Sequence, residues 1–270
     1  MLVGAYAAIP AIKEATQYAA YGDQPADIHA AFTFVLGLLL VFRTNAAYAR
    51  WWEARSLWGA LVNASRNLAV KISALAQIDQ LDLMRSRGLI VSFPRLLRDH
   101  LRNTARNTRY EMLAADSSEL PHIPSEVVEQ LYILLAKWKA AGQIDGDELR
   151  VIDADALRLL DICGGCEKIR NTRIVRSYRI FARQCVVLSL LTFPWGVANE
   201  FHWWTIPMST IMAYFMLGLE TVAEHVEEPF GYDEDDLDLD GLCDTIARSV
   251  HQVYERRDVL KTMLASPATN

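Results

Sequence analysis

The sequence has little cysteine, glycine, proline or lysine. Four Cys in 270 residues cannot form the disulfide framework of a small secreted protein. With 13 Gly and 9 Pro beside 52% hydrophobic residues, the chain is not collagen-like, low in complexity or disordered. A net charge of -6 argues against a protein built mainly to coat nucleic acid. At about 150 residues per domain, the length indicates one or two compact units.

The sequence also lacks long β-strand patterns and catalytic motifs. No segment alternates apolar and polar residues for long enough to predict a sheet, so we expect an all-α protein. The sequence holds no Ser–His–Asp arrangement, HExxH motif, P-loop or dinucleotide fingerprint at usable spacing. We therefore expect no enzymatic activity.

Positive charge is distributed unevenly. The chain has 21 Arg and 6 Lys, and residues 20–34 and 184–247 contain neither. Three apolar runs occupy Ala30–Phe42, Cys185–Ala198 and Trp203–Val222. The first two are short for a hydrocarbon core of about 30 Å, so length alone also allows buried core helices. Apolar runs that alternate with basic segments favour a multi-pass membrane protein.

The flanks of these runs predict two membrane hairpins. Tyr21–His29 and Gly196–Trp204 lack Lys and Arg, whereas the opposite ends are rich in Arg. By the positive-inside rule, the hairpin tips point away from the cytoplasm and both chain termini lie in it. Met1–Ala20 would be the outgoing arm of the first hairpin; it lacks the features of a signal peptide, and we expect part of this helix to lie upstream.

These patterns divide the chain into four parts. They are a first hairpin (1–58), a cytosolic helical region (59–182), a second hairpin (183–228), and an acidic loop with a C-terminal cytosolic helix (229–270). Periodic segments predict helices at Leu61–Ala76, Leu89–Tyr110, Ser125–Ala141 and Asp147–Thr172, and another from Leu242. Pro194 and Pro207 fall inside apolar runs and predict kinks.

Two stretches resemble the bestrophin family of membrane channels. One runs from FVLG at Phe34–Gly37 through Trp58, and the other is ETVAEHVEEPFGYDEDD at Glu220–Asp236. The resemblance implies an all-helical homopentamer with a central pore, four membrane helices per subunit and a large cytosolic helical region. It implies a channel of the chloride-channel type, which conducts small monovalent ions across a prokaryotic inner membrane.

Phe34, Leu38 and Phe42 are the candidate pore neck. Their i, i+4, i+8 spacing places them in one stripe of a helix, and five copies around an axis would give three apolar rings. Such rings can gate a pore by dewetting. The resemblance assigns three apolar residues at this spacing to the neck; an alternative register gives Ala30, Phe34 and Leu38. Without the resemblance, such a stripe is more often ordinary core.

The candidate neck leaves ion selectivity open. Aromatic edges favour anions and aromatic faces favour cations, but Leu38 is not aromatic. Asp23 and Asp27, at the proposed outer mouth, would raise the local cation concentration. The resemblance also implies a second, cytosolic constriction, for which rough position suggests Ile152.

The acidic run Asp233–Asp240 has the composition of a calcium site. An EF-hand alignment fails because its twelfth position would be Ala247 instead of Glu. The resemblance implies a divalent-cation clasp that uses Asp233 and Asp236, but Glu228 and His225 differ from the family pattern. The alternative is a solvated acidic loop that caps the next helix.

Two further features carry rival interpretations. Cys163 and Cys166 could serve a soluble or peripheral redox or metal protein, although packing of a helix is the simpler interpretation. A basic helix face is expected to pair with acidic neighbours at subunit contacts rather than to bind nucleic acid. It consists of Arg95, Arg98, Arg102, Arg106 and Arg109. A non-conducting membrane scaffold is the remaining alternative.

Overall fold

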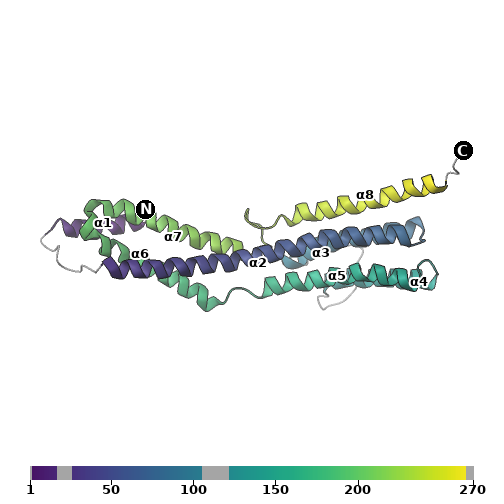
Figure 1. Ribbon diagram of the computed structural model, residues 1–270, viewed down its shortest axis with the longest axis horizontal. Helices are drawn as coiled ribbons and strands as arrows, with labels where there is room; N and C mark the ends of the chain where they lie inside the picture. Colours follow the sequence, from purple (N-terminus) through teal and green to yellow (C-terminus); the bar gives the residue numbers. More distant parts are fainter. Residues whose placement is uncertain (1, 17–25, 105–121, 266–270) are drawn as a thin grey trace. The chain divides into compact units, whose positions relative to one another are not determined.

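The computed structural model describes residues 2–16, 26–104 and 122–265, and within them every regular element is helical, which confirms the all-α prediction (Figure 1). In chain order the elements are α1 (Leu2–Glu14), α2 (Ala26–Leu75), α3 (Gln80–Leu101), α4 (Ile123–Ala140), α5 (Gly146–Asn171), α6 (Arg176–Phe201), the short 3₁₀ helix η1 (His202–Trp204), α7 (Thr205–Glu227) and α8 (Leu239–Ala265).

The chain divides into two compact units. Unit 1 comprises Met1–Trp51 and Arg173–Pro229, and unit 2 comprises Trp52–Thr172 and Phe230–Asn270. The sequence placed the corresponding boundaries after residues 58, 182 and 228. The membrane and cytosolic assignments of the four predicted parts stay predictions.

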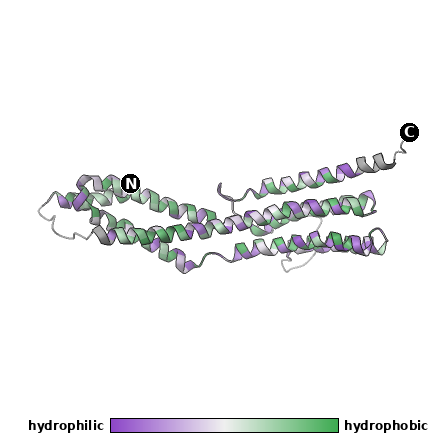
Figure 2. Ribbon diagram, in the orientation of Figure 1, coloured by the Kyte–Doolittle hydropathy of each residue, from purple (hydrophilic) through white to green (hydrophobic). Residues whose placement is uncertain are grey.

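Unit 1 contains α1, the first part of α2, α6, η1 and α7. Helices α1, α6 and α7 contact one another, and an apolar cluster of Leu36, Leu40, Val186 and Met216 joins α2 to α6 and α7. Two helical stretches of the described residues, His29–Leu75 and Arg176–Glu227, are long and apolar enough to span a bilayer. Hydrophobic residues predominate in α1, α6, α7 and the first half of α2 (Figure 2).

Close helix contacts in unit 1 require small residues. A Cβ atom built on Gly4 of α1 would lie 2.8 Å from Oγ1 of Thr210 on α7. A Cβ atom on Gly196 of α6 would collide with the ring of His29 on α2. Small residues at such crossings let helix backbones approach closely, which is a common way of packing helices in lipid.

The two prolines in the apolar runs differ in position. Pro194 lies inside α6, where a proline leaves one backbone carbonyl of the helix without its hydrogen bond. Pro207 is the third residue of α7, where the backbone N–H has no partner within the helix in any case. The position of Pro207 therefore does not require a kink, and the kinks expected at Pro194 and Pro207 stay predictions.

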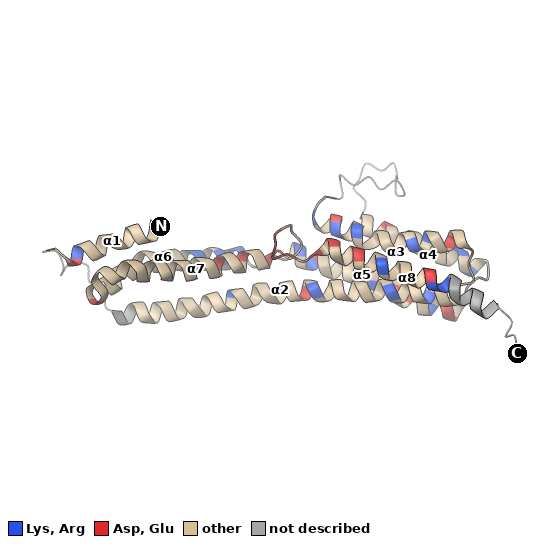
Figure 3. Ribbon diagram, turned by 90° about the horizontal axis from the view of Figure 1, so that it is seen from above, with Lys and Arg blue, Asp and Glu red and all other residues tan. Residues whose placement is uncertain are grey.

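Unit 2 contains the second part of α2 with α3, α4, α5 and α8. Charged residues are frequent on these helices, whereas they are sparse in the first half of α2 (Figure 3). Helix α3 contacts α4, α5 and α8, and α4 contacts α5. The core includes Trp58, Phe93 and Trp138, which are fully buried. Each large aromatic side chain of this kind buries a large apolar area.

Candidate pore-lining site

The predicted neck stripe lies on an exposed face of α2. Phe34, Leu38 and Phe42 are 68%, 44% and 65% exposed in the single subunit. The core residues Leu36 and Leu40 are each two positions away from a stripe residue, or about 200° around the helix axis at about 100° per residue. Helix α2 therefore packs against α6 and α7 with one face and presents the stripe on the opposite face.

Because the stripe residues are exposed, they are not part of the subunit's own hydrophobic core. A side chain that lines a conduit between subunits has to be exposed in the isolated subunit, and all three residues are. Ala30 is exposed as well, so the alternative register of Ala30, Phe34 and Leu38 lies on the same face. Exposed apolar residues also occur on α6 and α7, such as Phe181 and Phe215, so exposure alone does not select the pore face.

A cluster of four charged residues lies one residue beyond the stripe. Arg43 is fully buried on α2 and forms an ion pair with Glu220 of α7. Arg183 of α6 donates from Nε to Glu220 at 2.9 Å and contacts Glu224 through Nη2 at 2.7 Å. Two positive and two negative charges thus neutralise one another. Residues 43 and 220 are 177 positions apart, and the sequence analysis missed this cluster because no local motif marks it.

Of the residues expected at the outer mouth and at the second constriction, only Ile152 has a described side chain. Asp23 lies outside the described residues, and Asp27 lies in α2 but its side chain is not described. Ile152 lies on α5, and its side chain is completely buried inside unit 2. A buried side chain cannot line a conduit between subunits. Ile152 is therefore wrong as the second constriction.

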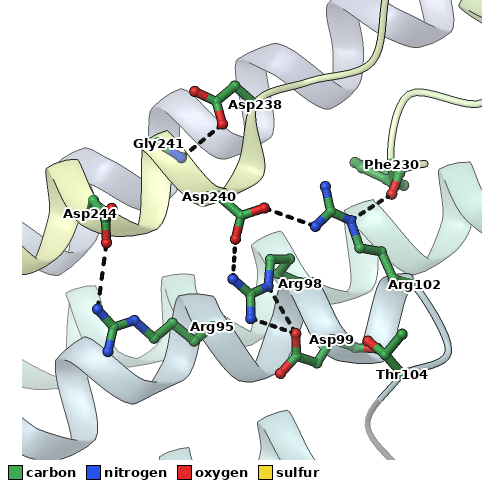
Figure 4. Close-up of polar contacts among 10 residues, drawn as sticks. All are labelled: Arg95, Arg98, Asp99, Arg102, Thr104, Phe230, Asp238, Asp240, Gly241 and Asp244. Atoms are coloured by element: carbon green, nitrogen blue, oxygen red, sulfur yellow. Dashed lines mark hydrogen bonds and ion pairs between the residues drawn. The ribbon is translucent and has the colours of Figure 1, made fainter. Parts of the chain in front are cut away.

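The arginines of α3 have acidic partners on α8 of the same chain (Figure 4). Asp240 forms ion pairs with Arg98 and Arg102, and the Arg102 contact measures 3.0 Å. Arg95 lies 3.5 Å from Asp244, one turn further along α8. The expected pairing exists, but it occurs within the subunit rather than at a subunit contact. Arg106 and Arg109 lie outside the described residues.

Arg102 also organises the loop before α8. Its Nε donates to the carbonyl of Phe230 at 3.3 Å (Figure 4). Its guanidinium lies 4.3 Å from the centre of the Tyr232 ring. In the same loop, the carboxylate of Asp236 accepts a hydrogen bond of 2.7 Å from the backbone N–H of Asp233. The loop is thus held by the cation of Arg102, which directly follows α3, and by its own backbone.

These contacts do not fit the calcium clasp that the resemblance implies. A guanidinium binds the Phe230 carbonyl, and an oxygen of Asp236 is already engaged with the backbone of Asp233. Glu228, which stands where the family pattern has Asn, forms an ion pair of 2.8 Å with Arg173. Calcium requires six to eight oxygen ligands. A divalent cation at Asp233 and Asp236 stays a prediction.

Cys163 and Cys166 are buried side chains of α5. Both are free thiols. Burial, with a contribution from the charge of Glu167, raises the pKa of Cys163 to about 12, and burial also raises the pKa of Cys166. Neutral, inaccessible thiols are poor nucleophiles and poor metal ligands. Between them, Gly165 lies against Leu57 of α2, as expected for packing of a helix.

Comparisons with known proteins agree with the resemblance. Residues 2–252 match the family model described as Bacterial/Fungal Bestrophin protein. The chain is 32% identical to the voltage-dependent anion channel-forming protein alr2987 of Nostoc over 81% of this chain and 74% of that protein. It is 32% identical to the voltage-dependent anion channel-forming protein sll1024 of Synechocystis, over 83% of this chain and 76% of that protein.

Solved structures share the fold. A crystal structure of a single-residue mutant of a bacterial bestrophin homologue from Klebsiella pneumoniae superposes with a TM-score of 0.84 at 24% identity, over 93% of this chain and 96% of the other. A crystal structure described only as that of a mutant membrane protein gives a TM-score of 0.86 at 24% identity, over 94% and 96%. Fold, sequence identity and family model agree, and the chain belongs to the bestrophin family.

Proposed function

We propose that five copies of this chain surround a central pore in a prokaryotic inner membrane and conduct small anions. The observation that carries the proposal is the exposed apolar stripe of Phe34, Leu38 and Phe42 on the face of α2 opposite its packed face. The two cyanobacterial relatives are named as voltage-dependent anion channel-forming proteins, which supports anions as the cargo.

In the pentamer the stripe residues form three rings. Eight residues at about 1.5 Å per residue separate the first ring from the last, so the neck is about 12 Å long. Side chains without hydrogen-bonding groups hold water weakly, so an ion has to shed part of its hydration shell to pass. The two Phe rings can turn their positive edges toward the ion, which offsets part of this cost for an anion.

The charges next to the neck are consistent with an apolar gate. Arg43 follows Phe42 directly but is buried and paired with Glu220, so it places no free cation at the end of the neck. The barrier then depends on the size and polarity of the three rings. No catalytic step is assigned to the chain. The buried, neutral thiols of Cys163 and Cys166 argue against the redox alternative.

Chloride flux through purified protein in liposomes tests the neck. We expect Phe34→Ala and Phe42→Ala to widen a ring and raise the flux by about tenfold, which corresponds to a barrier lower by about 1.4 kcal/mol. Phe215→Ala is the matched control because Phe215 is an equally exposed Phe on α7. We expect this control to conduct like the wild type.

Two results would contradict the proposal. Wild-type liposomes that release no more chloride than empty ones would favour the non-conducting scaffold. A rise in flux that is the same in Phe215→Ala as in the neck variants would remove the neck assignment.

Reversal potentials in asymmetric KCl separate anion from cation selectivity, and we expect them to lie near the chloride equilibrium potential.

A further inference from the structure

Three side chains of metal-ligand type converge in unit 2, away from the stripe. His100 is in the last turn of α3, His122 caps the start of α4, and Glu167 is near the end of α5. Nε2 of each histidine lies 2.7 Å from the same carboxylate oxygen, Oε1 of Glu167. The three ligand atoms lie within 4.8 Å of one another. All three side chains are partly exposed, so ions from solution can reach them.

Neighbouring contacts fix the positions of these ligands. Arg170, one turn after Glu167 on α5, donates to the backbone carbonyl of His100 at 2.8 Å. Nδ1 of His122 lies 2.6 Å from Oγ of Ser125. Nδ1 also accepts a hydrogen bond of 3.2 Å from the Ser125 N–H, which caps α4. A metal on Nε2 would place the ring proton on Nδ1, which would give up this cap and donate to the Ser125 hydroxyl instead. Such partners of the second ring nitrogen are typical of metal-bound histidines, because they hold the ring in orientation.

The local charge suits a cation. Burial raises the pKa of Glu167, but hydrogen bonds from His122 and His100 outweigh this effect, so its pKa lies below the usual value and the carboxylate is ionised at neutral pH. Two imidazoles and one carboxylate form a set that zinc uses in proteins with three ligands and one open position.

We propose that His100, His122 and Glu167 bind one divalent transition-metal ion, with zinc as the expected metal. Zinc–nitrogen bonds of about 2.0–2.1 Å in a tetrahedron place ligand atoms about 3.3 Å apart. The 2.7 Å contacts therefore have to open by about 0.6 Å, which small rotations of three partly exposed side chains allow. The ion would replace the two protons that join the histidines to Glu167, and it would link the ends of α3, α4 and α5. This inference does not rest on the proposed channel function.

Zinc binding to the purified full chain tests the site. After treatment with a chelator, the protein is dialysed against micromolar zinc; the metal content per chain is measured by atomic emission and the affinity by competition with a chromophoric chelator. Loss of a ligand should weaken binding at least as strongly as loss of an outer-shell partner, by about 100-fold or more. The variants are His122→Ala and Glu167→Gln.

His251→Ala is the matched control. His251 belongs to another exposed His–Glu pair of unit 2, with Nε2 at 3.3 Å from Glu255 on α8. We expect one zinc per chain in the wild type and in this control. Cobalt should give the visible absorption of a tetrahedral complex, and this absorption should be lost in Glu167→Gln.

Two outcomes would overturn the assignment. In the first, the chelator-treated wild type takes up no zinc at micromolar concentration, and the cluster is then only a hydrogen-bonded group of two histidines and Glu167. In the second, Glu167→Gln retains wild-type affinity. Glu167→Gln preserves side-chain size, so it decides the question if His122→Ala fails to fold, as judged by circular dichroism.

Discussion

At the scale of single residues, Asp82 is a buried charge that links two helices of unit 2. Its carboxylate accepts hydrogen bonds from Nζ of Lys137 at 2.8 Å and 3.0 Å and from Nε1 of the buried Trp138 at 3.0 Å. The hydrogen bond from Lys137 is the main cause that lowers the pKa of Asp82, against the opposing effect of burial. The ionised form of Asp82 therefore stabilises the contact between α3 and α4.

This contact predicts a pH-dependent stability. Because the pKa of Asp82 is lower in the folded state, its contribution is complete above the unfolded value near 4 and is lost as pH falls through the folded value. We expect Asp82→Asn to cost about 1–3 kcal/mol at pH 7, since it removes charge-assisted hydrogen bonds. Thermal unfolding in detergent should show this difference in stability between the wild type and Asp82→Asn at pH 7, and a smaller difference below pH 4. An equal difference at both pH values would contradict the assignment.

Individual residues show where sequence patterns reach their limit. The spacing of Phe34, Leu38 and Phe42 was sufficient to place them on one face, because three positions of one helix need only the helical period. The partners Arg43 and Glu220 could not be paired from the sequence, since tertiary packing brings them together. Ile152 was chosen from its rough position alone, which takes no account of its place on the buried face of α5.

At the scale of elements, α8 is attached to α3 through its first turn. Asp240 pairs with Arg98 and Arg102 there, and Asp238 caps the helix by accepting from the Gly241 N–H at 2.8 Å. Burial raises the pKa of Asp240, but the hydrogen bond from Arg102 and the charges of both arginines outweigh it, so the pKa is below its ordinary value. Asp240 therefore stays ionised, and the pairing persists in mild acid.

We predict that Asp240→Asn loosens the start of α8. Hydrogen exchange at residues 239–245 should become faster, because the first turn loses its contacts with two arginines of α3. Added salt should reduce the difference from the wild type, since Asp240 is more than half exposed and its pairing is screened. Asp244→Asn is the control, as its single contact with Arg95 at 3.5 Å is weaker. Equal exchange in both variants would argue against this attachment.

The start of α5 was predicted to within one residue and that of α3 was not, although a cap lies at both. Asp145 and Glu148 form a capping box at the start of α5, and the predicted helix, Asp147–Thr172, differs from Gly146–Asn171 by one residue at each end. The start of α3 was predicted nine residues late, at Leu89. Polar residues and Gly88 obscured the periodicity of its first turns, although Asp79 caps it by accepting from the Asp82 N–H at 2.8 Å.

At the scale of the whole molecule, a single subunit leaves apolar surface exposed and forms no closed conduit by itself. Unit 1 has exposed apolar residues on α2, α6 and α7, and lipid or another subunit would cover them. A continuous conduit needs several copies of the stripe around one axis. The pentamer proposed above gives the stripe that environment.

The assembly itself can be measured directly. We expect native mass spectrometry of the detergent-solubilised protein to give a complex of five chains of 30.5 kDa each. The complex should also require detergent for extraction and resist carbonate washing, as an integral membrane protein does. A monomer in mild detergent, or release by carbonate, would contradict the pentameric membrane channel. Phe34→Ala should leave the number of chains in the complex unchanged, because the stripe faces the axis.

The neutral cluster of Arg43, Arg183, Glu220 and Glu224 has a consequence for any response to voltage. An electric field does about 2.3 kcal/mol of work per elementary charge and 100 mV, but only on net charge that moves. Two cations and two carboxylates that move together have none. While these ion pairs stay intact, a membrane potential cannot drive α2 through Arg43, and a voltage sensor in this chain would have to use other charges.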